Sequence, residues 1–321
     1  MIESHTYPPV SIVVPCRNRA HYLAPTIDSI LGQDYPDLEC IVVDGASTDG
    51  TRAILERYED RIRWISEPDE GHADAINKGW RMSRGEIVAW LNADDLYVVP
   101  DAVRLSVDYL IKHPDVDVVY GNYAGLSKDG AVTSGVIRTR DWNIEYAVKY
   151  CFPVIMQPTS FLRKSILDRA GWVDSYDDHG LWLRIGLTGK IRHAPIHVAY
   201  VRRDPGLSNQ RYISEGKVLL TKEFLSRSDL PATMKRTSFR RRAVSNAHLI
   251  AAIGIGVGNH LPLVSLGHIL RALAVDPLNA PYVFMSYITY LVFHALPLSW
   301  QERIRRRKWP FVQGISGGSG E

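Results

Sequence analysis

Cysteine is scarce in this 321-residue sequence, which contains only three. Cys16, Cys40 and Cys151 are odd in number and far apart, so they provide neither a disulfide framework nor the spacing of a zinc site. Cys16 and Cys40 lie in or beside predicted strands, where a free cysteine behaves as a small buried hydrophobe. This pattern favours a reducing, cytoplasmic location.

A large excess of charge is also missing, because 38 basic residues are set against 35 acidic ones. The net charge of +3 is too small to indicate a nucleic-acid partner. The hydrophobic fraction of 45% is that of a folded protein, and the length suits one large domain with or without a smaller appendage. Basic residues gather in two clusters, Arg236 with Arg240–Arg242 and Arg303 with Arg305–Lys308. Such clusters fit solvated helix faces or an anionic membrane surface.

Long apolar runs that would clearly span a membrane are absent too. Met1–Pro9 has neither a basic start nor an apolar core, so we expect no signal peptide. Residues 243–270 and 278–300 contain no Asp, Glu, Lys or Arg, but glycines and prolines interrupt them. Tyr282–Leu298 is borderline for a membrane span, which needs roughly 20 apolar residues, and a hairpin of two spans is the alternative. We therefore expect C-terminal helices that pack on the rest of the chain or lie in the membrane interface.

The glycine motifs of common nucleotide-binding folds are missing. No G-x-G-x-x-G follows the first predicted strand, and no G-x-x-x-x-G-K-[ST] occurs. The loop Asp44–Thr51 is not a calcium loop, because Asp49 stands where glycine is required and no Glu closes it. Any nucleotide bound here would be held by acids and a metal instead.

What the first 121 residues do contain is a regular alternation of strands and helices. This alternation predicts an α/β fold with a mostly parallel sheet flanked by helices. A less regular region follows, with a hairpin expected at Lys128–Gly130. The predicted strands are Ser11–Val14 (ending at Pro15), Glu39–Val43, Ile62–Ser66, Ile87–Leu91 and Val116–Gly121, and the predicted helices are Tyr22–Leu31, Arg52–Tyr58, His72–Met82 and Ala102–Lys112.

The most informative stretch is Gly85–Asp95. Ile87–Leu91 is apolar without interruption, as in a strand covered on both faces, and the run is soon followed by the adjacent carboxylates Asp94 and Asp95. Ligands bind at the carboxyl ends of strands in open α/β sheets, and neighbouring carboxylates there suit a divalent cation that carries phosphate oxygens. An acidic turn without a ligand is the plainer interpretation.

A second acidic pair, Asp177 and Asp178, opens an apolar helix that includes Leu181–Arg184. The positive end of a helix dipole stabilises the charged form of a carboxylate, although a helix cap alone would explain one of the two acids. A carboxylate kept ionised next to a metal-bound diphosphate is what a general base for a sugar hydroxyl requires.

Seven motifs in this order resemble the family 2 glycosyltransferases of the GT-A fold, over about Val10–Ser208. Each is weak alone, whereas the ordered series is specific. They are Val14–Asn18, Gln33–Pro36, Val42–Thr51, Ser66–Gly71, Asp74–Gly79, Leu91–Asp95, and Asp177–Asp178 before Leu181–Arg184. The resemblance implies a Rossmann-like GT-A catalytic domain over residues 1–210, with its nucleotide-binding half at about 10–121 and its acceptor half at about 122–210. A C-terminal helical region would occupy residues 211–321.

The resemblance also implies roles for single residues. Asp95 would bind Mg²⁺ or Mn²⁺ bridging the two phosphates of a nucleoside-diphosphate sugar, and Asp178 would be the catalytic base of a one-step, inverting displacement. Asp204 stands where many members carry a histidine that contacts metal or diphosphate, and it would serve as a carboxylate ligand. Ala93 and Gly180 also depart from the family pattern, each replacing an acid. The donor-binding residues would be Pro15, Arg17, Asp44, Asp74, Lys78 and Asp94.

The sequence therefore predicts an inverting, metal-dependent glycosyltransferase of the cytoplasm or of the cytoplasmic membrane face. It would move a sugar from a nucleotide donor, with UDP favoured over dTDP or GDP, to a hydroxyl of a glycan or glycolipid in surface polysaccharide assembly. The alternative is a degenerate member that binds nucleotide or carbohydrate as a scaffold. A sugar-nucleotide pyrophosphorylase is disfavoured, because Pro15–Asn18 is not the glycine-rich basic loop that it needs.

Overall fold

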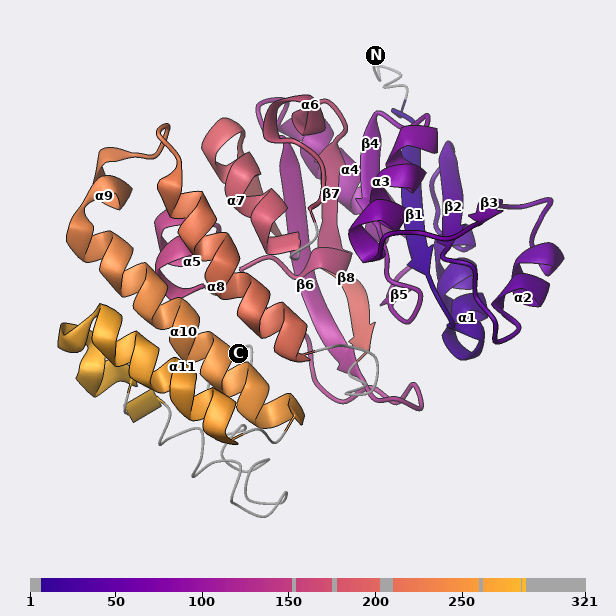
Figure 1. Ribbon diagram of the computed structural model, residues 1–321. Helices are drawn as coiled ribbons and strands as arrows, with labels where there is room; N and C mark the ends of the chain where they lie inside the picture. Colours follow the sequence, from indigo (N-terminus) through magenta and orange to yellow (C-terminus); the bar gives the residue numbers. More distant parts are fainter. Residues whose placement is uncertain are drawn as a thin grey trace. The chain divides into compact units, whose positions relative to one another are not determined.

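The computed structural model describes residues 7–151, 154–174, 178–202, 210–259, 262–283 and 285–286. The chain forms two compact units (Figure 1). The first comprises Met1–Trp142 and Ile155–Arg203, and the second Asn143–Val154 and Asp204–Glu321. Residues 143–154 thus belong to the second unit, although the sequence analysis places them in the acceptor half of the catalytic domain. That functional assignment stays a prediction.

A mixed sheet forms the centre of the first unit. Its strands run in the spatial order β3-β2-β1-β4-β7-β6-β8-β5. Neighbouring strands from β3 to β4 are parallel, as are β6 and β8, whereas β7 is antiparallel to both of its neighbours and β5 to β8. The strands are β1 Val10–Cys16, β2 Leu38–Asp44, β3 Arg63–Ser66, β4 Ile87–Trp90, β5 Leu96–Tyr97, β6 Val118–Leu126, β7 Ser160–Arg163 and β8 Ile191–Arg202. The predicted α/β class is confirmed.

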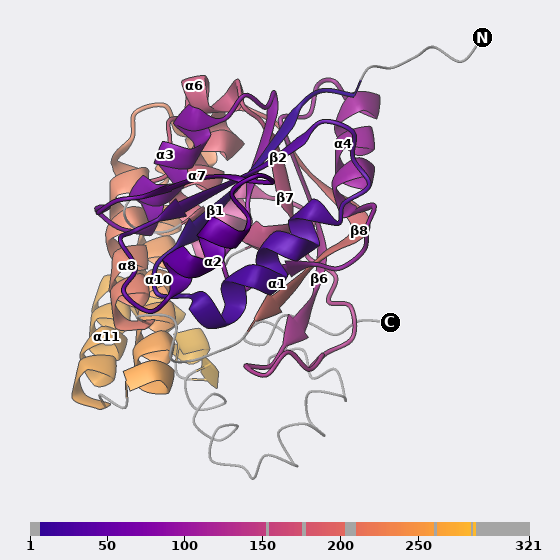
Figure 2. The same cartoon turned by 90° about the vertical axis from the view of Figure 1, so that its right-hand side faces the viewer.

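Helices cover both faces of this sheet, as Figure 2 shows for α1 and α4 on one side and α3, α6 and α7 on the other. Side chains alternate along a strand, so Ile12 and Val14 pack with α1 and α4 while Val13 packs with α3. The uninterrupted apolar runs of the sequence follow from this double coverage. The helices are α1 Ala20–Leu31, α2 Thr51–Arg57, α3 His72–Met82, α4 Ala102–Lys112, α6 Ile166–Ala170 and α7 Asp178–Thr188, with a 3₁₀ turn at Gln157–Thr159.

The predicted end of the first strand at Pro15 is wrong, because β1 continues to Cys16. Leu91 donates its N–H to the carbonyl of Val13, so the odd residues of β1 present their polar backbone groups to β4. Pairing with β4 ends at Val13, two residues before Pro15. A backbone N–H at position 15 would therefore have had no partner on β4, so β1 tolerates a proline, which lacks this N–H.

The hairpin expected at Lys128–Gly130 is confirmed. The fifth predicted strand continues as β6 to Leu126, and Ser127 then donates its N–H to the carbonyl of Ala131. Gly130 adopts φ of 86°, a left-handed conformation that glycine enters without a steric penalty.

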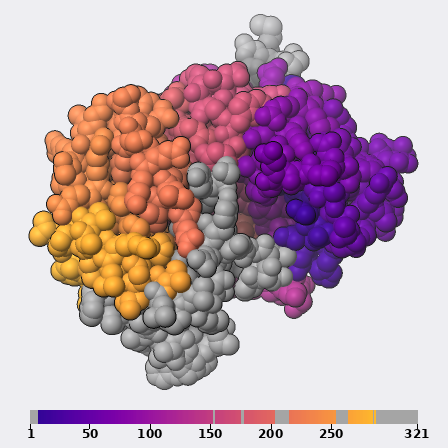
Figure 3. All heavy atoms as spheres, viewed as in Figure 1, coloured from indigo at the N-terminus to yellow at the C-terminus, as the bar shows by residue number. Residues whose placement is uncertain are grey.

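The second unit is helical and is organised around its longest helix, α10. This helix packs against α5, α8, α9 and α11, and α8, α10 and α11 form the orange and yellow surface in Figure 3. Polar contacts join them: Asn246 donates to the carbonyl of Lys149 at 2.8 Å, and Arg242 pairs with Asp276 at 2.6 Å. The helices are α5 Ile144–Tyr150, α8 Gln210–Ser226, α9 Ala232–Lys235, α10 Thr237–Asn259 and α11 Pro262–Val275, with a 3₁₀ turn at Pro277–Asn279. Among the described residues, none of the helices combines the length and apolar character of a membrane span.

Gly79 allows α3 to pack directly on β1, because an added methyl group would overlap the side chain of Val13. Gly79→Ala should favour helix formation by about 1 kcal/mol. We expect overpacking to cost about 1–3 kcal/mol and to exceed that gain, so that amide exchange in α3 accelerates.

Gly267→Ala in α11 is the matched control, since nothing in the described part of the chain lies within 4 Å of its added methyl group. It should slow amide exchange in α11. Slower exchange in both helices would show that α3 does not need the small residue.

Candidate functional site

The loops that follow β1 and β2 are hydrogen-bonded to each other at the carboxyl ends of these strands. Cys16 and Asp44 are paired in register, so both loops leave the sheet at the same edge. The backbone N–H of Asn18 donates to Ser47 Oγ at 2.7 Å, and Thr48 donates its N–H to Asn18 Oδ1 at 2.8 Å. Asn18 takes the left-handed φ of 53°, which asparagine tolerates better than most residues. Two separate loops therefore act as one surface.

Asp44, a predicted donor-binding residue, is fully buried. Its carboxylate accepts hydrogen bonds from the backbone N–H and hydroxyl of Ser47 and from Ser66 Oγ at 2.7 Å. A nucleotide base would have to replace one of these donors to reach it. Pro15 is buried in β1 next to it, whereas Arg17 is exposed on the loop.

Asp74 and Lys78 lie one turn apart on α3 and hold the preceding loop. Lys78 Nζ is 3.2 Å from Asp74 Oδ2 and 2.9 Å from Glu67 Oε1, and it donates to the carbonyl of Pro68 at 3.0 Å. The backbone N–H of Glu70 lowers the pKa of Asp74, and the bond to Glu67 raises the pKa of Lys78. Both charges are thus engaged within the protein.

The adjacent carboxylates Asp94 and Asp95 differ in exposure. Asp95 is 2% exposed, and its oxygens accept from the N–H of Arg202 at 2.8 Å and from Asn92 Nδ2 at 3.0 Å. Burial, and then the charge of Asp94, raises the pKa of Asp95 to about 8. Asp94 is only partly buried, and burial raises its pKa against the opposing effect of Arg19. Negative charge at this loop is incompletely compensated by the protein.

These two carboxylates fit a divalent cation. They provide hard oxygen ligands, and the raised pKa values mark a place where added positive charge would be stabilising. No cluster of three or more His, Cys, Asp or Glu side chains occurs within the described ranges, so phosphate oxygens and water would have to complete the coordination shell. Asp204, the other ligand predicted beside Asp95, lies outside the described residues.

Arg202, at the end of β8, anchors the loop Leu91–Asp95 between β4 and β5, here called the acidic loop, and it was not among the predicted site residues. Its Nε donates to the carbonyl of Asp94 at 2.9 Å, and its Nη1 donates to the carbonyls of Ser127 at 2.7 Å and Lys128 at 2.9 Å. The guanidinium carbon also lies 4.7 Å from the ring centroid of Tyr22. These partners come from distant parts of the chain, and only its place two residues before Asp204, a predicted ligand, could have drawn attention to Arg202.

Asp178, the predicted base, is the first residue of α7 and is partly buried. Trp182 donates its indole N–H to Asp178 Oδ2 at 3.0 Å. Nε2 of His72, at the start of α3, lies 3.0 Å from Oδ1 of Asn92, so His72 contacts the acidic loop. Asp177 lies outside the described residues.

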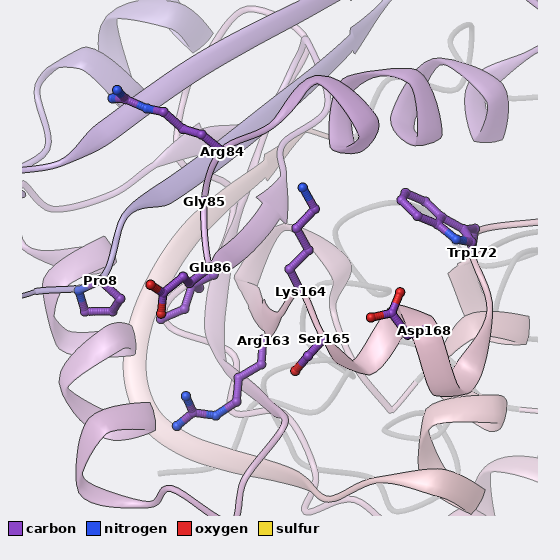
Figure 4. A pocket seen from close by; sticks show the side chains of 10 residues that line it. Pro8, Arg84, Gly85, Glu86, Arg163, Lys164, Ser165, Asp168 and Trp172 are labelled. Atoms are coloured by element: carbon purple, nitrogen blue, oxygen red, sulfur yellow. The ribbon is translucent and has the colours of Figure 1, made fainter.

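A pocket of 470 Å³ lies at the opposite end of β4 from the acidic loop (Figure 4). Ile87, the first residue of β4, lines it together with Glu86, Lys164, Asp168 and Trp172. The Lys164 ammonium donates to the carbonyl of Ser83 at 2.7 Å. None of the predicted site residues lines this pocket, so it is distinct from the candidate donor site.

Comparison with known proteins decides the family. Residues 11–168 match the family model for glycosyl transferase family 2. The recognition of a family 2 glycosyltransferase is thereby confirmed for this segment, which is just under half of the chain. Similar curated proteins include an uncharacterized glycosyltransferase of Rickettsia bellii, 38% identical over 39% of this chain and 18% of that protein, and chondroitin synthase of Pasteurella multocida, 26% identical over 59% of this chain and 20% of that protein. The chain spans only about a fifth of the length of these two relatives.

Solved glycosyltransferase structures share the fold. Staphylococcus aureus TarS 1-349 in complex with UDP-GlcNAc superimposes with a TM-score of 0.61 at 18% identity, over 88% of this chain and 92% of that one. The mannosyltransferase PcManGT from Pyrobaculum calidifontis, in complex with GDP-Man and Mn²⁺, gives 0.57 at 22% identity, over 90% and 86%. The predicted GT-A fold and the C-terminal helical region are confirmed.

Replacing Arg202 should loosen the acidic loop and the hairpin together. Arg202→Ala leaves three carbonyls without their donor, and we expect unfolding to become easier by about 2 kcal/mol, with faster proteolysis at residues 127–130. Arg202→Lys should not restore stability, because an ammonium lacks the planar fork of donors. Stability and cleavage rate are measured by urea unfolding and limited proteolysis.

Arg52→Ala is the control for loss of an arginine. Its exposed pair with Glu56 should contribute less than about 0.5 kcal/mol. A stable Arg202→Lys variant would contradict the anchoring role.

Proposed function

We propose that this protein is an inverting, metal-dependent glycosyltransferase that uses a nucleoside-diphosphate sugar. One observation carries the proposal: a single unit contains both the acidic loop after β4 and the helix that begins with Asp178, and the two are joined by a ring contact. Trp90, the last residue of β4, stacks on Trp182 of α7 at 5.7 Å between centroids. A cation at Asp94 and Asp95 and a base at Asp178 would thereby be carried by elements that pack against each other.

The donor nucleotide would lie over the joined loops after β1 and β2. Pro15 and Arg17 would line the base pocket, and Asp44 would accept from the base in exchange for a serine donor. Asp74 and Lys78 would shape the rim through the loop that they hold. TarS binds UDP-GlcNAc and PcManGT binds GDP-Man. UDP is our first choice of nucleotide, and dTDP and GDP stay open because the base contacts inferred from the sequence are generic.

We place Mg²⁺ or Mn²⁺ at Asp94 and Asp95, where a bound cation would neutralise the charge that develops on the diphosphate leaving group. Asp94 is the more exposed carboxylate and would make the direct contact. Asp95, predicted from the sequence to be the ligand, has both oxygens in hydrogen bonds and would chiefly hold the loop and contribute negative charge. Asp204 remains a further candidate ligand. The Mn²⁺ bound by PcManGT supports a metal requirement.

Asp178 would act as the general base. It accepts the proton of the acceptor hydroxyl while the oxygen attacks the anomeric carbon from the side opposite the diphosphate, and the configuration inverts in one step. The carboxylate already accepts the indole N–H of Trp182, which favours its ionised, base-competent form.

The acceptor would be a glycan or lipid-linked sugar in surface polysaccharide assembly. The similarity to a chondroitin synthase supports a polymer-forming role. A cytoplasmic protein held peripherally on the membrane would meet such an acceptor. A nucleotide- or carbohydrate-binding scaffold is the alternative, and the presence of Asp94, Asp95 and Asp178 argues against it.

A thermal-shift screen with UDP, GDP, dTDP and CMP, each with and without Mn²⁺, tests the donor site. A nucleotide at 100 times its dissociation constant should stabilise the fold by about 2.7 kcal/mol. We expect one diphosphate to give a metal-dependent shift, and Asp94→Asn to abolish the metal dependence. Asp60→Asn, an exposed acid before β3, should behave as the unmodified chain does. The absence of a shift with every nucleotide would contradict the donor site.

Asp178→Asn tests the base. The substitution preserves shape, so the melting temperature and the nucleotide-induced shift should stay the same, while sugar transfer should fall about 10²- to 10⁴-fold. Release of the nucleoside diphosphate from the sugar donor is the measured quantity. A variant that transfers at the original rate would remove Asp178 from the mechanism.

A further inference from the structure

Three buried tryptophans connect the middle strand of the sheet to the helices on one face. Trp80 of α3, Trp90 of β4 and Trp182 of α7 are each at most 1% exposed. Trp90 and Trp182 are stacked, with an interplanar angle of 10°, and Trp80 meets Trp90 edge-on at 5.2 Å. Such ring pairs stabilise a core beyond the area that they bury.

The two stacked indoles differ in their hydrogen bonds. Trp182 donates its N–H to Asp178 Oδ2 at 3.0 Å, across one turn of α7. The N–H of Trp90 is buried and has no partner within the described part of the chain. A buried indole N–H usually finds an acceptor. The two rings are similar in size and packing, but within the described residues only Trp182 is bonded to the candidate base.

We propose that Trp182 is a positioning residue for Asp178. Its N–H holds one carboxylate oxygen, and its ring is kept in place by Trp90. The inference rests on the proposed function, in which Asp178 removes the acceptor proton.

This arrangement has two consequences for the reaction. The indole N–H fixes the position of Oδ2, which limits rotation of the carboxylate that would accept the hydroxyl proton. The ring stack also ties the base to the strand that Asp94 follows four residues after Trp90. The stacking contact is thus one of the packing interactions between β4 and α7 that would set the separation between base and cation.

Nuclear magnetic resonance of the indole N–H groups tests the contact without a substrate. In the full chain, the Trp182 indole signal, assigned with Trp182→Phe, should shift as the pH is lowered, and the shift should disappear in Asp178→Asn. His179, which is titratable, and the Asp174–Arg184 ion pair are near Asp178 along the chain, and Asp178→Asn separates their effect from that of Asp178. A Trp182 signal that is the same in Asp178→Asn would overturn the proposal.

Kinetics test the role. Trp182→Phe keeps an aromatic ring but removes the donor, so Asp178 should hold its proton to higher pH. We expect kcat for hydrolysis of UDP-GlcNAc with Mn²⁺ to fall about tenfold, with little change in KM, and the acidic limb of the pH profile to move up by about one unit.

Trp90→Phe is the matched control, because it removes a similar volume from the same stack and an N–H that has no described partner. It should lose comparable stability and leave the acidic limb in place. Equal displacement of the limb in both variants would mean that packing, not the N–H, matters, and would overturn the proposal. Full activity in Asp178→Asn would instead defeat the proposed function, while the indole signal would still report the contact.

Discussion

The structure of the first unit depends on one constraint at the end of β4, where a carboxylate is buried although burial disfavours its charged form. A strand covered on both faces leads into two adjacent carboxylates, and water is largely excluded from the second of them. The protein meets this cost with an amide from Asn92, a backbone N–H from Arg202 and a raised pKa at Asp95. The loop is fixed by its own buried acid, and the surrounding strands and helices must arrive in the right place to supply the donors.

Several elements can be understood as supports for that loop. Arg202 brings the end of β8 and the hairpin at residues 127–130 to the carbonyl of Asp94. Thr26 of α1 donates its hydroxyl to the carbonyl of Asp95, and His72 of α3 contacts Asn92. Helices from both faces of the sheet therefore contact the acidic loop, at Asn92 and Asp95. Precise placement of a charged site in a GT-A fold follows from this convergence and from ordinary core packing.

Local patterns were sufficient for much of the fold. The helices His72–Met82 and Ala102–Lys112 begin and end as predicted, because their apolar periodicity and flanking turns are encoded within a few residues. Pro15 was misassigned because its tolerance depends on where a neighbouring strand ends. Arg202 was missed because its partners lie far away in the sequence. The candidate acids were visible as motifs, whereas the unequal burial of Asp94 and Asp95 arises only from tertiary packing.

The path of the chain between the two units affects how the protein is made. The segment Asn143–Val154 is synthesised in the middle of the first unit, yet its helix α5 packs on α10, about a hundred residues later. During synthesis the side chains of α5 that pack on α10 lack this partner until α10 has left the ribosome. A fragment that ends after the first unit would leave the same side chains without their partner helix. The C-terminal helices are in this sense part of the folding of the middle of the chain.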